Sequence, residues 1–240
     1  MSSPRRLADY HAVLAMAQGI EGQRQAYRNY TPLSRSFYSG DTLAVAWALL
    51  GMRLVRSLDG ARVSGIIVET EAYCGTSDEG CHAYRGRTAR TAVMFGPPGH
   101  AYVYFIYGRY YCFNVVAHRE GGVGAVLVRA LQPLEGLAVM RARRPGHPDR
   151  KLTNGPAKLC LALGIGRELN GWDLCAGEKL WLEEGEPVPD EQVRVGPRVG
   201  LKVGEYARTR PWRFAVAANP WVSQPAPAWS LAEVAPTWPK

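Results

Sequence analysis

Residues 101–116, AYVYFIYGRYYCFNVV, constrain the fold of this 240-residue chain more than any other segment. Two runs of β-branched and aromatic residues meet at Tyr107, Gly108 and Arg109, and this pattern predicts an antiparallel β-hairpin. Tyrosine is an ordinary strand residue. At an exposed tip, however, it can also wedge between the base steps of a duplex while a neighbouring arginine meets a phosphate.

The rest of the chain predicts a single mixed α/β (α+β) domain, because no linker or internal repeat divides it. Strands are expected over 61–73 and over 124–131, the second ending at Pro133. Helices are expected over 42–50, with Asp41 or Ser39 as N-cap and Gly51 as terminator, over 134–143, and over 156–165. The acidic, proline-bearing segment 178–191 is expected to face away from a polyanionic partner.

The charge of the chain favours such a partner. It carries 29 basic and 21 acidic side chains, and all but five of the basic ones are arginine. The planar guanidinium of arginine can donate two hydrogen bonds to one phosphate. No apolar run approaches the ~20 residues that span a bilayer, so we expect a soluble, cytoplasmic protein with no membrane partner. The five cysteines form no C-x-x-C pair, which favours reduced thiols over a disulfide framework or a zinc ribbon.

Glu69 and Glu71 stand two apart on the predicted 61–73 strand and therefore share one face with Tyr73. A carboxylate among apolar and aromatic groups can act as a general acid or base. For such a pair alone, a solvated strand face is the simpler interpretation. The neighbouring His82 and the tyrosine hairpin favour chemistry instead.

A metal site is a weaker interpretation of this region. Cys74, Cys81 and His82 are close in sequence, but their spacing fits no common zinc pattern and a fourth ligand is not evident. We therefore expect neither a metal nor another cofactor.

Seven blocks follow one another between residues 31 and 223: IVETEAY, HAYRG, MFGPPGHAYVYFIYG, YYCFNVV, VLVRALQPLEG, LTNGPAKLCLALGI and PWRF. Together they resemble the alkyladenine (3-methyladenine) DNA glycosylase family, and blocks of this length and order are far more specific than a single short motif. The resemblance implies a curved antiparallel sheet with a protruding β-hairpin and helices packed around it, in a monomeric enzyme.

The resemblance also implies a reaction. Glu71 matches the general base that activates a water against the anomeric carbon, and Arg129 matches the arginine that helps to hold this water. Glu69 has no implied catalytic role and is interpreted as structural. No lysine precedes Lys151, which favours a monofunctional glycosylase that leaves an intact abasic site, although folding could bring Lys158 close.

The implied substrate is double-stranded DNA with a damaged purine, which must leave the base stack before it can be attacked. Tyr73, His82 and Tyr104 match the aromatic walls that hold the flipped base, and Asn114 matches a residue that crowds the amine of normal guanine. Tyr107 matches the intercalating residue. Alkylated purines are the expected lesions, with deaminated and etheno purines as further candidates.

Phosphate contacts are expected from arginines, with Arg85, Arg87 and Arg109 as candidates beside Arg35 and the arginines between residues 141 and 144. Two positions depart from the family pattern. Thr91 stands where asparagine is expected, which puts some loop hydrogen bonding in doubt. Arg109 stands where an apolar residue is common.

Two other classes of function remain open: a non-catalytic protein that binds damaged duplexes, and a metal-dependent nuclease that uses Glu69 and Glu71. The expected organisation is an N-terminal extension over 1–30, either one weak helix or disordered, a glycosylase domain over 31–225 and a C-terminal tail over 226–240.

Overall fold

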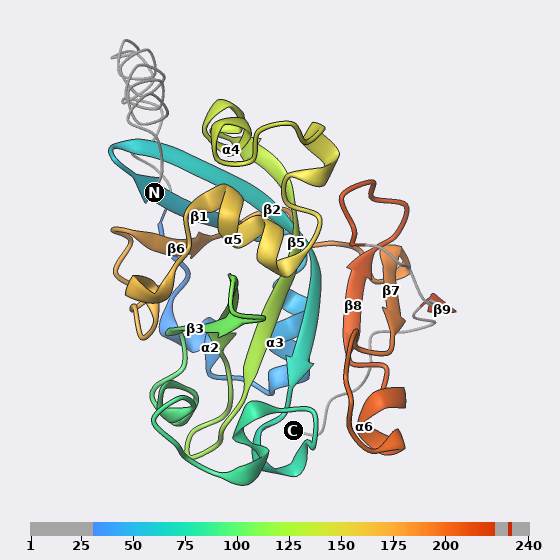
Figure 1. The fold of residues 1–240 in the computed structure, drawn as a ribbon. Coiled ribbons are helices and arrows are strands. Elements are labelled where there is room, and N and C mark those ends of the chain that lie inside the picture. The colour runs from blue at the N-terminus through green and yellow to red at the C-terminus, as the bar shows by residue number, and fades with distance from the viewer. Residues whose placement is uncertain (1–30, 224–229, 232–240) are drawn as a thin grey trace.

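Nine strands form one antiparallel sheet in the computed structural model, which describes residues 31–223 and 230–231 (Figure 1). The strand order is β3-β4-β5-β2-β8-β7-β9, with β1 paired to β2 and β6 paired to β1. The strands are β1 (Arg53–Leu58), β2 (Ala61–Tyr73), β3 (Ala101–Ile106), β4 (Tyr110–Val116), β5 (Ala125–Glu135), β6 (Leu180–Glu183), β7 (Val193–Gly196), β8 (Arg213–Val216) and β9 (Ser230–Leu231).

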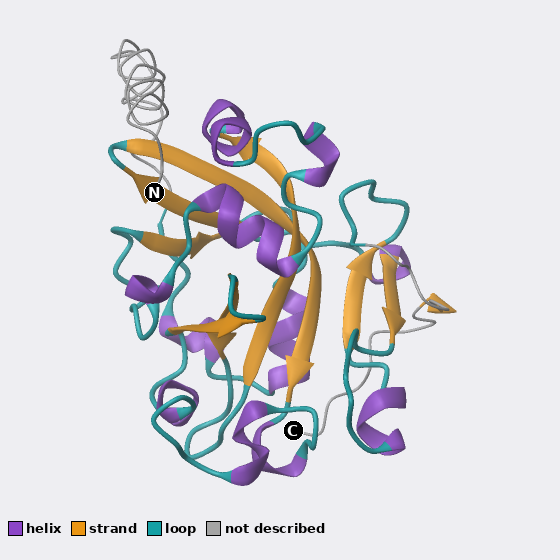
Figure 2. Ribbon diagram, in the orientation of Figure 1, coloured by secondary structure: helices purple, strands orange, loops and turns teal. Residues whose placement is uncertain are grey.

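Helices cover this sheet, and the predicted fold class is confirmed. In the view of Figure 2, α3 packs behind β2 and β5, and α5 packs in front of β4 and β5. The described α-helices are α2 (Arg35–Tyr38), α3 (Thr42–Ala48), α4 (Leu137–Arg143), α5 (Pro156–Leu163) and α6 (Glu205–Thr209). Short 3₁₀ helices lie at Gly75–Ser77, His82–Arg85, Ala92–Phe95, Asp149–Lys151, Arg167–Leu169 and Asp190–Gln192.

Helix α3 begins where the sequence predicts. The side chain of Asp41 accepts hydrogen bonds from the backbone amides of Leu43 and Ala44, at 2.9 and 3.4 Å, and so satisfies two donors of the first turn. Its apolar residues Val45 and Ala46 are buried in the main core. The helix is thereby fixed against the strand that carries the two glutamates.

Strand β2 is the centre of the sheet, and it changes partner along its length. Its first half, up to Ile66, pairs with β1, whereas Glu69, Thr70 and Glu71 pair with β8 on the same edge. Its other edge pairs with β5, and register shifts around Glu69 mark β-bulges at the point where the partner changes. Because bulges bend and twist a strand, they add curvature here. Both glutamates consequently lie inside the fold.

The 178–191 segment, expected to face away from a polyanionic partner, contains the strand β6, which the sequence did not predict. Its four residues are all buried and pair with β1. Strand β5 does not end at Pro133. It continues to Glu135 because the bulge between Ser64 and Gly65 accommodates a residue that has no amide proton to donate. The helix predicted from residue 134 therefore begins at Leu137.

The hairpin of β3 and β4 forms as predicted, from Ala101 paired with Val115 to Ile106 paired with Tyr110. Tyr107 and Gly108 form its turn, with φ angles of 52° and 63°, and the amide of Arg109 donates to the carbonyl of Ile106 over 3.2 Å. Glycine takes this left-handed conformation without strain, but a tyrosine rarely does. The fold thus holds an aromatic side chain at a position that favours glycine.

The predicted extension over 1–30 lies outside the described residues. Within the 226–240 segment predicted as a tail, Ser230 and Leu231 form β9 and pair with β7. Among the described residues, no helix has the length and apolar character needed to cross a bilayer.

Candidate active site

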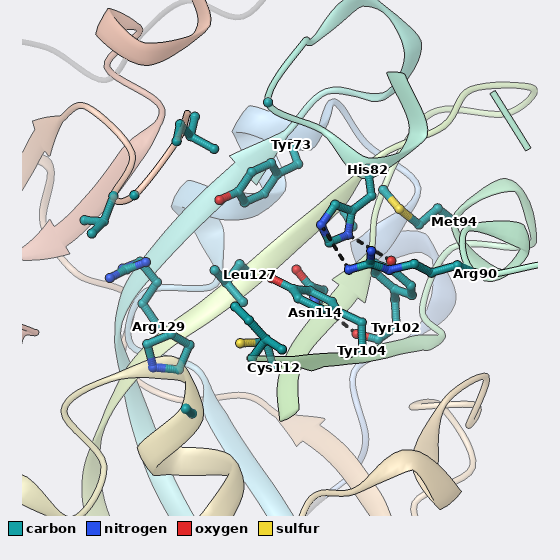
Figure 3. A pocket seen from close by; sticks show the side chains of 18 of the residues that line it. Tyr73, His82, Arg90, Met94, Tyr102, Tyr104, Cys112, Asn114, Leu127 and Arg129 are labelled. Atoms are coloured by element: carbon teal, nitrogen blue, oxygen red, sulfur yellow. Dashed lines mark hydrogen bonds between the residues drawn. The ribbon is translucent and has the colours of Figure 1, made fainter. Parts of the chain in front are cut away.

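A cavity of about 400 Å³ opens between β2, the β3–β4 hairpin, β5 and the start of α5 (Figure 3). Five of the residues singled out from the sequence line it from five different strands or loops: Tyr73, His82, Tyr104, Asn114 and Arg129. Glu71 lies directly behind this lining, in contact with Tyr73 and Arg129. The fold therefore brings these candidate residues together around one space, although they are up to 58 positions apart in the chain.

Glu71 is fully buried and held by three donors. Its Oε2 accepts a hydrogen bond of 2.8 Å from the Tyr73 hydroxyl, and its Oε1 accepts one of 2.7 Å from the backbone amide of Val199. The Arg129 Nη1 lies 3.2 Å from the same Oε1. A solvated strand face, the simpler interpretation of the glutamate pair, is wrong, because neither carboxylate is exposed.

Arg129 bridges the two glutamates. Its Nε donates to Glu69 Oε1 over 2.9 Å while its Nη1 faces Glu71. Burial alone would lower the pKa of Arg129, but the carboxylates of Glu71 and Glu69 outweigh burial and hold that pKa above its ordinary value. The guanidinium is therefore a permanent positive charge at the wall of the cavity.

His82 and Tyr104 are in edge-to-face contact, with ring centroids 4.6 Å apart and planes at 78°. A third ring stacked between them would need about 7 Å, twice the contact distance of carbon atoms. The two side chains therefore form one surface together, and the free width of the cavity lies on the side of Tyr73 (Figure 3).

The imidazole of His82 is held neutral. Its Nδ1 lies 2.9 Å from the Tyr102 hydroxyl, and its Nε2 lies 3.4 Å from Nη2 of Arg90, which leaves Nε2 as the acceptor. Partial burial, with the charge of Arg90 as a smaller cause, lowers the pKa of His82 to about 4. Arg90 also lies 5.4 Å from the centroid of the Tyr104 ring.

Asn114 is almost fully buried at 3% exposure and donates its amide to the Tyr102 carbonyl over 3.0 Å. This bond fixes the side chain across the β3–β4 pair, where Tyr102 is its register partner. Its orientation at the cavity wall is therefore set by the hairpin.

Tyr73 rests on an arginine that the sequence did not single out. The Arg198 guanidinium lies 4.7 Å from the Tyr73 ring centroid and 4.9 Å from that of Trp212, so it stands between two aromatic rings. Asp78 accepts from both Nη atoms of Arg198, at 2.5 and 2.7 Å, and all four oxygen and nitrogen atoms are buried. Arg198 precedes Val199 in a segment that contains no recognisable sequence motif. The sequence analysis therefore did not identify it as a residue of the site.

The candidate DNA contacts differ in their surroundings. Tyr107 lines the mouth of the cavity and is 87% exposed, and Arg85, Arg87 and Arg109 are exposed as well. Other arginines proposed from the sequence are paired within the protein: Arg35 with Asp173, and Arg141 with Asp149. Arg144 is buried and donates to backbone carbonyls.

Thr91 keeps the loop before the hairpin hydrogen-bonded. Its Oγ1 accepts from the Thr88 amide over 2.8 Å and donates to the Gly86 carbonyl over 3.2 Å. Threonine therefore provides side-chain hydrogen bonds to the loop backbone at the position where asparagine was expected.

Residues 36–220 match the methylpurine-DNA glycosylase (MPG) family. The chain belongs to this family. It is 49% identical over 192 residues to a protein of Carboxydothermus hydrogenoformans, covering 80% of this chain and 98% of that one. Proteins of Methanocella arvoryzae and Streptomyces avermitilis are 48% and 49% identical, each over 196 residues, covering 81% and 80% of this chain and 97% and 91% of those proteins.

All three relatives carry the name 3-methyladenine DNA glycosylase. The family is one of DNA repair enzymes that hydrolyse N-glycosyl bonds to alkylated bases, so the predicted enzyme class and family are confirmed. The sequence resemblance is thus confirmed over most of the chain.

In this glycosylase, Cys74 and Cys81 are thiols rather than thiolates. Burial raises the pKa of Cys74 to about 12 and that of Cys81 to about 11, with the nearby Asp78 carboxylate as a further cause for each. A thiolate, not a thiol, is the form that binds metal. Within 31–223, no cluster of three histidine, cysteine or acidic side chains is arranged to hold a metal ion.

We expect Asp78→Asn to destabilise this glycosylase by about 3–5 kcal/mol, because it leaves the buried Arg198 without its counter-charge. Urea denaturation followed by far-UV circular dichroism measures the change. The matched control is Asp149→Asn, which breaks an exposed carboxylate–arginine pair of similar length and is expected to leave the midpoint unchanged. Equal midpoints for both variants would contradict the role given to the Asp78–Arg198 pair.

Proposed function

We propose that this protein is a monofunctional glycosylase that flips alkylated purines out of double-stranded DNA and hydrolyses their N-glycosidic bond, leaving an abasic site. The observation that carries the proposal is a buried carboxylate, Glu71, at the back of a cavity with aromatic walls. The names of the relatives point to 3-methyladenine as one of the lesions.

The cavity suits a flipped purine. Tyr73 on one side and the His82–Tyr104 pair on the other offer aromatic surfaces, and every purine has a π face that can stack on a ring. Extrusion of a paired base costs a few kcal/mol and costs least where damage has weakened the pair. Asn114 would contribute selectivity, since its fixed amide narrows the cavity against a purine with an additional exocyclic amine.

The reaction needs one water and one base. Glu71 takes a proton from the water as the water oxygen bonds to C1′, and the C1′–N bond breaks with its electron pair leaving on the purine. For a cationic alkylpurine this electron pair neutralises the leaving group, so no acid is required. Arg129, beside Glu71, would hold the water, and the carboxylate would stabilise the positive charge that develops on the sugar.

Tyr107 would fill the space that the flipped nucleotide leaves in the duplex. It is exposed, lies at the mouth of the cavity and is part of the tight turn between β3 and β4. Arg109 next to it, with Arg85 and Arg87 on the neighbouring loop, would contact phosphates, so that affinity for DNA falls as salt is added. The enzyme would act as a monomer in the cytoplasm.

The lysines favour hydrolysis over strand cleavage. A glycosylase that also nicks DNA usually forms a Schiff base through an amine. Of the described residues that line the cavity, none is a lysine. Lys158, the candidate from the sequence, donates its Nζ to the Asn154 side chain over 2.9 Å instead.

The test uses end-labelled duplexes that each carry one alkyladenine, hypoxanthine or ethenoadenine, incubated with the protein in EDTA and, in parallel, with Mg²⁺. We expect breaks at the lesion that require alkali, and no adduct after borohydride. A borohydride-trapped adduct would contradict the monofunctional assignment. Breaks that need metal but no alkali would indicate a nuclease, and binding without base release would indicate a recognition protein.

A further inference from the structure

Glu69 is the most heavily hydrogen-bonded carboxylate near the cavity, although the proposed reaction does not use it. Its Oε1 accepts from Arg129 Nε at 2.9 Å, Arg213 Nε at 2.6 Å and Ser223 Oγ at 2.9 Å. Its Oε2 accepts from the backbone amide of Ser223 at 2.7 Å. The Glu69 and Arg213 side chains are entirely buried.

These contacts form one continuous array of charges. Arg213 bonds to Glu69, Glu69 to Arg129, and Arg129 reaches Glu71. The array crosses three neighbouring strands, since the glutamates lie on β2, Arg129 on β5 and Arg213 on β8. Its two positive and two negative charges balance, and a buried charge array of this kind is stable only while it stays balanced.

From this arrangement we propose that Glu69 and Arg213 are positioning residues for the reaction: they hold Arg129 against Glu71 and set the local charge that the catalytic carboxylate experiences. This inference rests on the proposed function of Glu71 as general base. Glu69 fixes Nε of Arg129, so only the outer nitrogens of that guanidinium can turn toward Glu71. Arg213 cancels the charge of Glu69, which would otherwise repel Glu71 and favour its protonation.

Other groups also face Glu71, and they belong to different elements. Electrostatic interactions connect Glu71 with Tyr73 of its own strand, Tyr104 of β3, Cys112 of β4, Arg129 of β5, Arg213 of β8 and Arg198 after β7. The tyrosines and the cysteine are neutral at working pH, since burial raises their pKa values. Arg198 is balanced by Asp78. The charge at Glu71 is therefore controlled mainly by the Arg213–Glu69–Arg129 array.

Ser223 closes the array from the C-terminal side. Its Oγ and its amide both donate to Glu69, and Arg129 Nη2 lies 3.3 Å from the same Oγ. Since serine carries no charge, it contributes geometry without changing the balance. Ser223→Ala therefore tests how the array positions Arg129 without changing the local charge at Glu71.

The experiment measures single-turnover excision of ethenoadenine, or of the best substrate found above, between pH 4.5 and 9. A base must be ionised, so the rate falls on the acid side as Glu71 gains its proton. The acid limb is the part of the pH profile over which the rate falls at low pH. Glu69→Gln leaves a surplus positive charge, which favours the ionised form and should move the acid limb about one pH unit lower. Arg213→Gln leaves a surplus negative charge and should move it about one unit higher.

The double variant Glu69→Gln/Arg213→Gln restores the balance, and its acid limb should return to the wild-type position even where its rate remains at least tenfold lower. Ser223→Ala should lower the rate without moving the limb. Glu183→Gln is the matched control: it removes another buried carboxylate from an arginine pair, with Arg62, away from the cavity. It should reduce the denaturation midpoint and leave the acid limb in place.

Opposite shifts in the two single variants would not arise from a loss of packing. Acid limbs that stay at the wild-type pH in both variants would overturn the inference, while excision by the wild type would still support the proposed function. If either single variant does not fold, Glu69→Asp and Arg213→Lys replace them. These two substitutions keep the charge of the side chain but change its length. The excision rate should therefore fall at least tenfold while the acid limb stays at the wild-type pH. An excision rate equal to that of the wild type would overturn the inference.

Discussion

Glu71→Gln is expected to lower the single-turnover rate of base excision at least about 1,000-fold, the largest effect that we expect from one substitution. Glutamine keeps the size of the side chain and one oxygen acceptor for the Val199 amide, but it cannot take a proton from water. It also leaves Arg129 facing a neutral group, so some stability should be lost. The measurement is base release from a lesion-bearing duplex in EDTA, with enzyme in excess.

Two controls make this result specific. Glu71→Asp retains a carboxylate with a shorter reach, so its rate should lie between those of the glutamine variant and the wild type. Binding to a duplex with a tetrahydrofuran abasic analogue should be retained in both variants, because Glu71 lies behind the residues that line the cavity. If Glu71→Gln excises the base at the wild-type rate, Glu71 is not the general base.

Tyr107→Gly should reduce excision from duplex DNA about 10- to 100-fold, corresponding to the ~1–3 kcal/mol that a stacked aromatic ring contributes. The same change should not lower the unfolding temperature. Tyr107 has a φ of 52°, a conformation that glycine adopts without strain, and its side chain is exposed. Function and stability should therefore separate at this position. Calorimetry and the excision assay measure the two quantities.

The control for the ring itself is Tyr107→Phe, which keeps the aromatic face and should remain close to wild type. A single-stranded substrate leaves no gap in a base stack, so the loss in Tyr107→Gly should be much smaller there. An equal loss on both substrates would contradict a wedge and would indicate that Tyr107 acts on the cavity instead.

The sequence predicted the parts of this molecule that depend on local pattern. The β3–β4 hairpin follows from alternating β-branched and aromatic residues around Gly108, and the start of α3 follows from a capping aspartate at residue 41. The family blocks supplied the candidate residues around the cavity. All of the proposed pocket and catalytic residues lie at one place in the structure, although their individual roles remain predictions.

What the sequence could not show depends on contacts between distant segments. Arg198 and Asp78 are 120 positions apart, and no periodicity connects them. Glu69 was interpreted as structural because the family resemblance implies no catalytic role for it. A strand pattern does not reveal that side chains from β5 and β8 bind it. Strand β6 was missed because four buried residues within an acidic segment give too short a signal.

The stack of Tyr73, Arg198 and Trp212 has a consequence for how this family can diverge. Each member is supported by the next, and Asp78 balances the charge between the two rings. A change at position 198 would leave two rings without their central contact and one carboxylate without its partner. Among members of the family, these four positions should therefore be substituted together or not at all, even where the surface residues around them vary.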